Sequence, residues 1–273
     1  MLEKEINKII DSFDFSNGKY NVKDIFRDII ELETYFIYVT MLQQKDKLDS
    51  FNKIVSKYTE KEQIYMWQIL YNLTNLYNKQ HEPNDILGEI FNKLNIGNAR
   101  TGQFFTPTHI SKAIASIAEI DVNEIKENGY ITISEPTCGA GGMILSVADR
   151  LKELGYDTYR NMFVQCWDID RYCAMMTFIQ LSMYDIPAQV IWGDTLALKP
   201  NEYFYTPAYF RFIRLREENK LLIPFCNLCN KEIVGQVHKS QLISNVKLCE
   251  DCFAIEQRVL LMEKIMNPQK NYN

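Results

Sequence analysis

The stretch from Thr132 to Leu145 constrains the fold more than any other part of this sequence. A short β-branched run, Ile131 to Ile133, is typical of a buried strand. Glu135-Pro136 ends that strand, Cys138 to Gly142 form a glycine-rich loop, and Met143 opens a helical pattern. A strand, a glycine loop and a helix together bring backbone amides close to a ligand at the helix N-terminus. Such a turn alone is a weak indication of a ligand loop, so its neighbours must support it.

Composition narrows the class of protein. The chain has 273 residues, enough for one large domain or two smaller ones, and 47% of them are hydrophobic. A net charge of −5 gives no overall basic footprint for nucleic acid, although a local basic face stays open. No stretch is apolar for long enough to cross a membrane, and the N-terminus lacks a signal-peptide layout. Seven cysteines, an odd number, suit a reducing compartment, so we expect a cytoplasmic protein without membrane contact.

The first part of the chain, residues 1–96, has a helical pattern. Apolar and aromatic residues recur at helical spacing over 22–42 and 64–77, and Glu82 to Asp85 are typical of a helix start. The aromatic stripes are explained more simply as core than as a ligand site. We therefore expect an N-terminal helical region, which could also carry a partner interface.

A loop-like segment from Asn98 to Thr108 contains two adjacent aromatic residues, Phe104 and Phe105. Thr106-Pro107-Thr108 then predicts a helix start with a hydroxyl cap next to a proline. Taken alone, the aromatic pair is better explained as a hydrophobic staple at the start of that helix than as a ligand contact.

Two further strand–helix units follow the glycine loop. The pattern predicts strands over 161–167 and 188–192, and helices over 143–154 and 171–184. Asp168 lies at the tip of the second strand, where a carboxylate suits a ribose diol. Asp194 lies at the tip of the third strand, where it could meet a base edge. A helix cap explains either aspartate alone, but two acids at successive strand tips beyond a glycine loop favour a nucleoside ligand.

Together these segments resemble the cofactor-binding half of an adenine-specific DNA methyltransferase, and most closely the modification (M) subunit of type I restriction systems. Gly102-Gln103-Phe104-Phe105-Thr106-Pro107 is similar to the family's Gly-Gln-Phe-Tyr-Thr-Pro motif, which closes over the methionine part of S-adenosylmethionine. The segment from Glu135 to Gly142 is similar to its Asp-Pro-x-x-Gly-x-Gly-Gly loop. Asp85-Ile86-Leu87-Gly88 also matches the helix upstream of the first motif.

The resemblance implies that the chain binds S-adenosylmethionine. Asp168 falls where the family's ribose-binding acid lies, and Asp194 falls where the family contacts the cofactor adenine. The implied cofactor-binding residues are Phe104, Phe105, Thr106, Pro107, Glu135, Pro136, Thr137, Cys138, Gly139, Gly141, Gly142, Asp168, Ile169 and Asp194. DNA is the implied substrate and a candidate partner.

One family motif is missing from the chain. The family grips its flipped target adenine with Asn-Pro-Pro-Phe or Asn-Pro-Pro-Tyr after the fourth strand, and a base taken from a duplex needs such a pocket. The nearest segment here, Tyr203 to Tyr209, has aromatic residues and one proline but no Asn-Pro-Pro. The catalytic residues therefore stay unassigned.

The family fold has more strands after the third one than this sequence has room for before its cysteine segment, which begins at Cys226. We expect an α/β fold that is a truncated, Rossmann-like methyltransferase fold whose first strand has lost its usual neighbour. Such an exposed edge is prone to association. We expect the Tyr203–Leu215 segment, a partner subunit or a second copy of the chain to cover it.

The last part of the chain contains two closely spaced cysteine pairs. Cys226 and Cys229, followed by Cys249 and Cys252, have the spacing of a zinc ribbon that holds one structural Zn²⁺ through four thiolates. The alternative is a pair of redox-active or incidental cysteine pairs. Cys138, Cys166 and Cys173 are better explained as small buried residues.

The expected organisation is a helical region at 1–96, an S-adenosylmethionine-binding domain at 97–210, and a zinc ribbon with a C-terminal helix at 211–273. Three functions remain open. The chain is a methyltransferase whose base pocket comes from a partner or from Tyr203–Tyr209, a non-catalytic regulator or anti-restriction factor that binds cofactor, DNA or protein, or a structural protein with a vestigial pocket. The missing tetrad disfavours the first function, the intact glycine loop and acids disfavour the third, and the residues alone favour the second.

Overall fold

The structure is a computed structural model that describes residues 2–16, 18–80, 82–96, 105–118 and 120–218, together with the backbone of two short strands. Its main sheet has four strands in the order β1-β2-β3-β4. They are β1 (Ile131–Glu135), β2 (Met162–Asp168), β3 (Ala188–Asp194) and β4 (Lys199–Tyr205). The first three are parallel and β4 is antiparallel to β3, so the predicted α/β class is confirmed.

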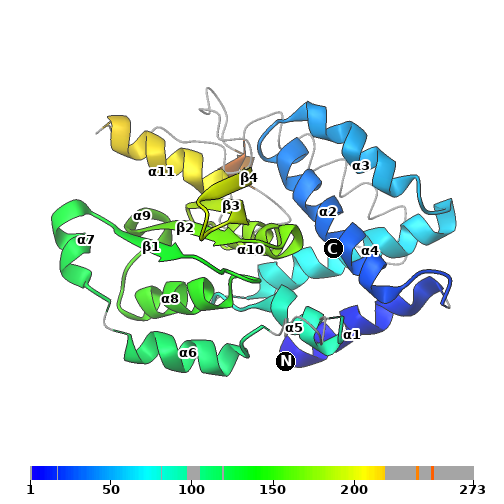
Figure 1. The fold of residues 1–273 in the computed structure, drawn as a ribbon, viewed down its shortest axis with the longest axis horizontal. Helices are drawn as coiled ribbons and strands as arrows, with labels where there is room; N and C mark the ends of the chain where they lie inside the picture. The colour runs from blue at the N-terminus through cyan, green and yellow to red at the C-terminus, as the bar shows by residue number, and fades with distance from the viewer. Residues whose placement is uncertain are drawn as a thin grey trace.

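Helices α8 (Gly142–Glu153) and α10 (Arg171–Met183) connect the parallel strands. Along β2, Met162, Val164 and Cys166 are buried while the alternate residues are more exposed, which is the period-two pattern of a strand with one face more deeply buried than the other. Helix α10 is buried from Cys173 to Ser182 because it packs against β3 and also against the N-terminal helix α2. Figure 1 shows this arrangement, with the N-terminal helices in blue and cyan beside the sheet.

The N-terminal part of the chain is helical, as its apolar periodicity predicts. Its helices are α1 (Leu2–Asp11), α2 (Val22–Thr40), α3 (Leu48–Val55), α4 (Glu60–Lys79) and α5 (Ile86–Lys93), with 3-10 turns at Ser12–Ser16 and Lys45–Lys47. A capping box formed by Thr59 and Glu62 starts α4, and Asp85 caps α5. One buried cluster extends from α1 to the sheet, and Tyr38 stacks on Phe178 at 5.4 Å between ring centroids. These helices and the sheet therefore share one core.

Helices α6 (Thr108–Ile117), α7 (Val122–Asn128), α9 (Thr158–Asn161) and α11 (Pro207–Glu218) complete the described fold. The predicted hydroxyl cap of α6 is wrong, because the N-cap residue is Pro107 and no side chain caps this helix. The Thr108 hydroxyl instead donates to Glu89 Oε1 at 3.0 Å. On the second face of the sheet, Phe212 of α11 stacks on Phe163 of β2 at 5.3 Å.

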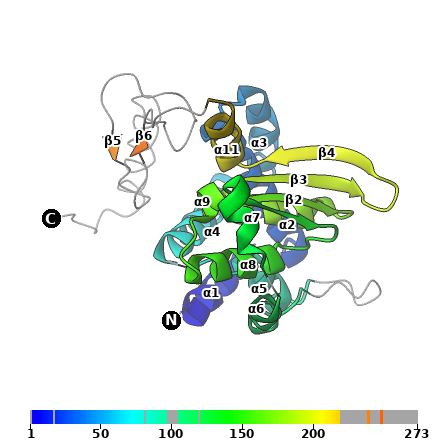
Figure 2. The same cartoon turned by 90° about the vertical axis from the view of Figure 1, so that its left-hand side faces the viewer.

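The fourth strand corrects one expectation about the sheet edge. Tyr203 to Tyr205 belong to β4, which pairs with β3 at the edge opposite β1 (Figure 2). Tyr203–Leu215 therefore does not cover the edge of β1 by strand pairing: α11 follows β4, and its Phe212 ring contacts Tyr130, next to the start of β1, at 5.1 Å between centroids. Within the described residues β1 is an edge strand, and coverage of that edge by a partner or a second copy stays a prediction.

Several predicted residues lie outside the described part of the chain. They are Phe104 among the cofactor residues and the four cysteines Cys226, Cys229, Cys249 and Cys252, so the zinc ribbon stays a prediction. Two short strands, β5 (His238–Lys239) and β6 (Lys247–Leu248), pair antiparallel and lie between the two cysteine pairs in the sequence. Across the described ranges no cluster of metal-binding side chains occurs, and no helix has the length and hydropathy to cross a membrane.

Candidate functional site

A cavity of about 830 Å³ lies at the carboxyl ends of the parallel strands. Its wall gathers most of the residues that the sequence motifs indicate: Phe105, Thr106, Glu135, Pro136, Thr137, Cys138, Gly139, Gly142, Asp168, Ile169 and Asp194. Two other predicted residues do not line the cavity: Pro107 is the N-cap residue of α6, and Gly141 is the N-cap residue of α8. Crevices at the carboxyl ends of parallel strands are the usual ligand sites of open α/β sheets.

The glycine loop between β1 and α8 is held from two sides. Gly139 has φ +56° and Gly141 has φ +94°, values that favour glycine. Cys138 N donates to Trp167 O at 2.8 Å, and the Thr177 hydroxyl donates to Gly139 O at 2.9 Å. No side chain caps α8, so the amides at its N-terminus can meet a ligand.

Asp168 connects the tip of β2 to this loop. Its Oδ2 accepts a hydrogen bond from Gly139 N and its Oδ1 accepts one from Asp170 N, each at 2.8 Å. Burial raises the pKa of the Asp168 carboxyl, and the two amide donors oppose that rise. Each carboxylate oxygen has a second lone pair that can accept a further hydroxyl proton.

The tips of β1 and β3 also meet across the cavity. The Thr195 hydroxyl donates to Pro136 O at 2.7 Å, and Glu135 Oε1 accepts from Thr137 N at 3.0 Å. Asp194 Oδ1 accepts from Ala197 N at 3.0 Å, which is the local capping role that a lone aspartate at this position allows. Ile169 is 74% exposed and lines the cavity, so its apolar side chain can cover the flat face of a ring.

Phe105 is clamped over the glycine loop. The Asn92 side chain donates to Phe105 O at 3.0 Å and accepts from Phe105 N at 3.2 Å. The Phe105 ring packs on Phe91 at 4.6 Å between centroids. It also lies so close to Gly139 that a Cβ there would be 3.0 Å from the ring. The motif segment and the glycine loop are therefore in direct contact.

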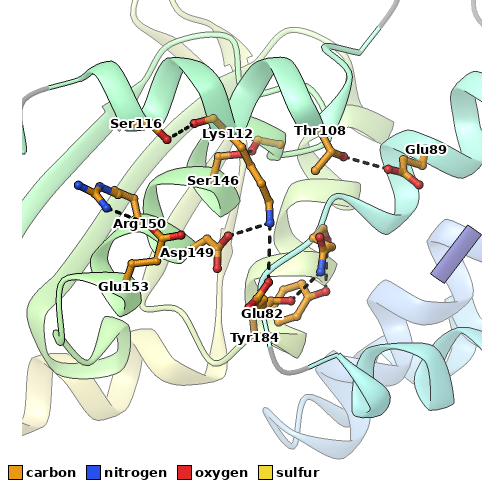
Figure 3. Close-up of polar contacts among 12 residues, drawn as sticks. Glu82, Glu89, Thr108, Lys112, Ser116, Ser146, Asp149, Arg150, Glu153 and Tyr184 are labelled. Atoms are coloured by element: carbon orange, nitrogen blue, oxygen red, sulfur yellow. Dashed lines mark hydrogen bonds and ion pairs between the residues drawn. The ribbon is translucent and has the colours of Figure 1, made fainter. Parts of the chain in front are cut away.

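Helix α6, which follows Phe105, is anchored by polar contacts. Figure 3 shows Lys112 directed toward Asp149 of α8 and toward Glu82, at 2.8 and 3.9 Å, and Thr108 directed toward Glu89. Asp149 is 7% exposed, so its ion pair with Lys112 is shielded from water on one side. These contacts fix α6 against α5 and α8 at the rim of the cavity.

Sequence reasoning missed several residues of the wall. Lys23 and Arg27 reach it from α2, and Ser111 and Asp85 reach it from α6 and α5. The sequence indicates Asp85 as part of a helix start that matches the family's helix upstream of the first motif, and not as a residue of the site. The two α2 residues carried no local signal, because their place depends on how α2 packs on α10, where Arg27 lies over the Tyr172 ring at 4.8 Å.

The segment from Tyr203 to Tyr209 does not reach the cavity. Because β4 is antiparallel to β3, Lys199 pairs with Asp194 next to the cavity, whereas Tyr205 pairs with Gln189 at the other end of the strand. Tyr203 and Tyr205 stack on each other at 6.2 Å between centroids, away from the cavity wall. This segment therefore does not line the cavity beside the glycine loop.

The fold is an α/β domain whose sheet has three parallel strands and one antiparallel strand, with the cavity at the carboxyl ends of the parallel strands. Residues 82–210 match the model of the family described as N-6 DNA Methylase. This match supports the adenine-specific DNA methyltransferase family that the sequence motifs indicate. No curated protein matched the chain.

Proposed function

We propose that this domain binds S-adenosylmethionine in the 830 Å³ cavity at the carboxyl ends of β1 to β3. The observation that carries the proposal is the convergence of separate motifs on one cavity. Phe105, the glycine loop, Asp168 and Asp194 come from four different parts of the sequence, and all of them line its wall.

The chemistry of these groups suits the parts of the cofactor. The Asp168 carboxylate has lone pairs for the two ribose hydroxyls, and Ile169 presents an exposed apolar side chain to the adenine ring. The uncapped N-terminus of α8 offers amide donors to a carboxylate. When bound, S-adenosylmethionine supplies an electrophilic methyl group.

We infer that the chain alone binds the cofactor without completing a site for the target adenine. The inference is supported by the lack of an Asn-Pro-Pro tetrad in the printed sequence and by the position of Tyr203–Tyr209 away from the cavity. The protein then acts as a cofactor-binding regulator, or as a methyltransferase subunit whose base pocket comes from a partner. A partner that positions the adenine amino group beside the cofactor methyl would contribute mainly by proximity.

Calorimetric titration of the purified protein with S-adenosylmethionine tests the proposal. We expect saturable binding of one cofactor per domain, and the absence of binding would leave a structural role for the isolated chain. An assay for transfer of a tritiated methyl group to DNA then distinguishes the cofactor-binding regulator from the methyltransferase subunit. Transfer by the chain alone would contradict the inference that its base pocket is incomplete.

A further inference from the structure

A buried carboxylate that is not among the predicted cofactor-binding residues lies against the N-terminus of α8. Asp85, the N-cap residue of α5, is 4% exposed and lines the cavity. Its Oδ1 accepts hydrogen bonds from Gly88 N at 2.8 Å and from Gln180 Nε2 at 2.7 Å. No donor from the described residues reaches its Oδ2.

The geometry aims this free oxygen at the glycine loop. A Cβ built on Gly142, the first residue of α8, would be 2.7 Å from Asp85 Oδ2. Gln180 holds the carboxylate in place, because its side-chain amide donates to both Asp85 Oδ1 and Ala140 O at 2.7 Å. The side chain of Gln180 is fully buried, so this arrangement is fixed within the core.

A second buried polar group lies in the same wall. Ser111 of α6 is fully buried, lines the cavity, and its hydroxyl has no hydrogen-bond partner within the described part of the chain. Buried polar atoms without partners are uncommon in folded proteins and costly to maintain. Asp85 and Ser111 therefore offer two unmet hydrogen-bonding groups, from two helices, to whatever occupies this end of the cavity.

The charge of the subsite indicates the chemistry of its ligand. None of the described lysine or arginine side chains forms an ion pair with Asp85, and an unpaired buried carboxylate is stabilised by a cation with hydrogen-bond donors. If Asp168 holds the ribose, the amino-acid end of the cofactor extends toward the glycine loop and α8. That end carries a carboxylate, which suits the helix N-terminus, and an ammonium group, which needs an acceptor.

We propose that Asp85 and Ser111 bind the α-ammonium group of the cofactor's amino-acid end, with Asp85 Oδ2 as its charged acceptor. This inference rests on the proposed function. It assigns to Asp85 a ligand contact in addition to its capping of α5, and it makes Asp85 a determinant of selectivity for nucleosides that carry an amino acid.

Two nucleosides test the proposal. S-adenosylhomocysteine carries the amino-acid end, whereas 5′-methylthioadenosine lacks it. Calorimetry measures the affinity of both for the wild type, for Asp85→Asn and for Ser111→Ala. We expect Asp85→Asn to lower the affinity for S-adenosylhomocysteine about tenfold or more, because a hydrogen bond between two charged groups is lost. We expect the affinity for 5′-methylthioadenosine to change less than about twofold, because this nucleoside has no amino-acid end.

Asp149→Asn is the matched control, since Asp149 is a buried aspartate on α8 that pairs with Lys112 and does not line the cavity (Figure 3). We expect this variant to leave the ratio of the two affinities unchanged. An equal loss of both affinities in Asp85→Asn, or no loss, would overturn the proposal and reduce Asp85 to a structural cap.

Two further outcomes are distinguishable. If the wild type binds neither nucleoside, the proposed function itself fails. If Asp85→Asn does not fold, wild-type protein is titrated with the analogue of S-adenosylhomocysteine in which hydrogen replaces the α-amino group. Affinity equal to that of S-adenosylhomocysteine would then refute the ammonium contact, and a loss of about tenfold would support it.

Discussion

Gly139 N lies 2.8 Å from Asp168 Oδ2, so the glycine loop after β1 is hydrogen-bonded to the tip of β2. The Asp168 carboxylate, which we propose accepts a hydrogen bond from a ligand hydroxyl, therefore also holds the glycine loop in place. Substitution of Asp168 removes both contributions, and the first prediction follows from this double role.

Asp168→Ala should lower the affinity for S-adenosylmethionine by more than about tenfold, because the ribose loses its acceptor and the loop loses a hydrogen bond. We expect the variant to stay folded. Calorimetry and thermal melting check both statements. Asp157→Ala is the control, because Asp157 caps the short helix α9 and does not line the cavity. Unchanged affinity in Asp168→Ala would refute the ribose-binding role.

Gly139→Ala tests the contact between the loop and the motif segment. The new Cβ would lie 3.0 Å from the Phe105 ring, so the ring must move, and φ +56° is strained for alanine. We expect a loss of about 1 kcal/mol in the free energy of unfolding and a clear loss of cofactor affinity. Gly155→Ala is the matched control, because Gly155 has φ +84° with nothing within 4 Å of the added Cβ. Equal cofactor affinity in both variants would contradict the role of the Gly139–Phe105 contact.

Glu33 of α2 should make the protein less stable as pH rises. It is 3% exposed, neither of its carboxylate oxygens has a partner in the described chain, and burial raises its pKa from 4.5 to about 8. Between these two values the folded state keeps a proton that the unfolded state releases. The free energy of unfolding therefore falls as pH rises through this window, by up to about 1.4 kcal/mol per pH unit, and levels off above the folded pKa.

Glu33→Gln should remove this dependence, because the amide carries no charge at any pH. Denaturant unfolding at pH 5, 7 and 9, compared between the wild type and the variant, measures the difference. We expect the variant to gain stability relative to the wild type as pH rises. Parallel pH profiles of the two proteins would show that Glu33 does not keep its proton in the folded state.

The cysteine pairs predict one bound zinc ion per chain. Elemental analysis should find one Zn²⁺ in the purified protein, and a double substitution, Cys226→Ser with Cys249→Ser, should abolish it. Cys166→Ala should keep the metal, because Cys166 is a buried residue of β2. Removal of zinc by a chelator should expose the segment after residue 218 to protease. Complete resistance of the metal-free protein would contradict a structural zinc site.

The free edge of β1 predicts an association. Hydrogen exchange should show that the amides of residues 131–134 that point away from β2 become protected once a partner subunit or a second copy covers the edge. Protection that rises with protein concentration would identify a second copy, and protection that appears only with added partner would identify another subunit. Fast exchange of these amides under all of these conditions would contradict coverage of the edge.

The sequence by itself determined the local features of the site. The glycine loop, the acids at the strand tips and the helical N-terminal region follow from side-chain periodicity and from the conformations that glycine permits. The family match over residues 82–210 agrees with those motifs. Each of these signals lies within one short segment, so no knowledge of distant contacts is needed to detect it.

Only the tertiary structure decided which distant faces meet. The packing of α2 on α10 brings Lys23 and Arg27 into the cavity wall, and the antiparallel direction of β4 takes Tyr203–Tyr209 away from it. Asp85 has the sequence signature of a helix cap, and its free oxygen faces Gly142 only because Gln180 of α10 holds it there. Such contacts depend on the packing of elements far apart in the chain, which local periodicity does not encode.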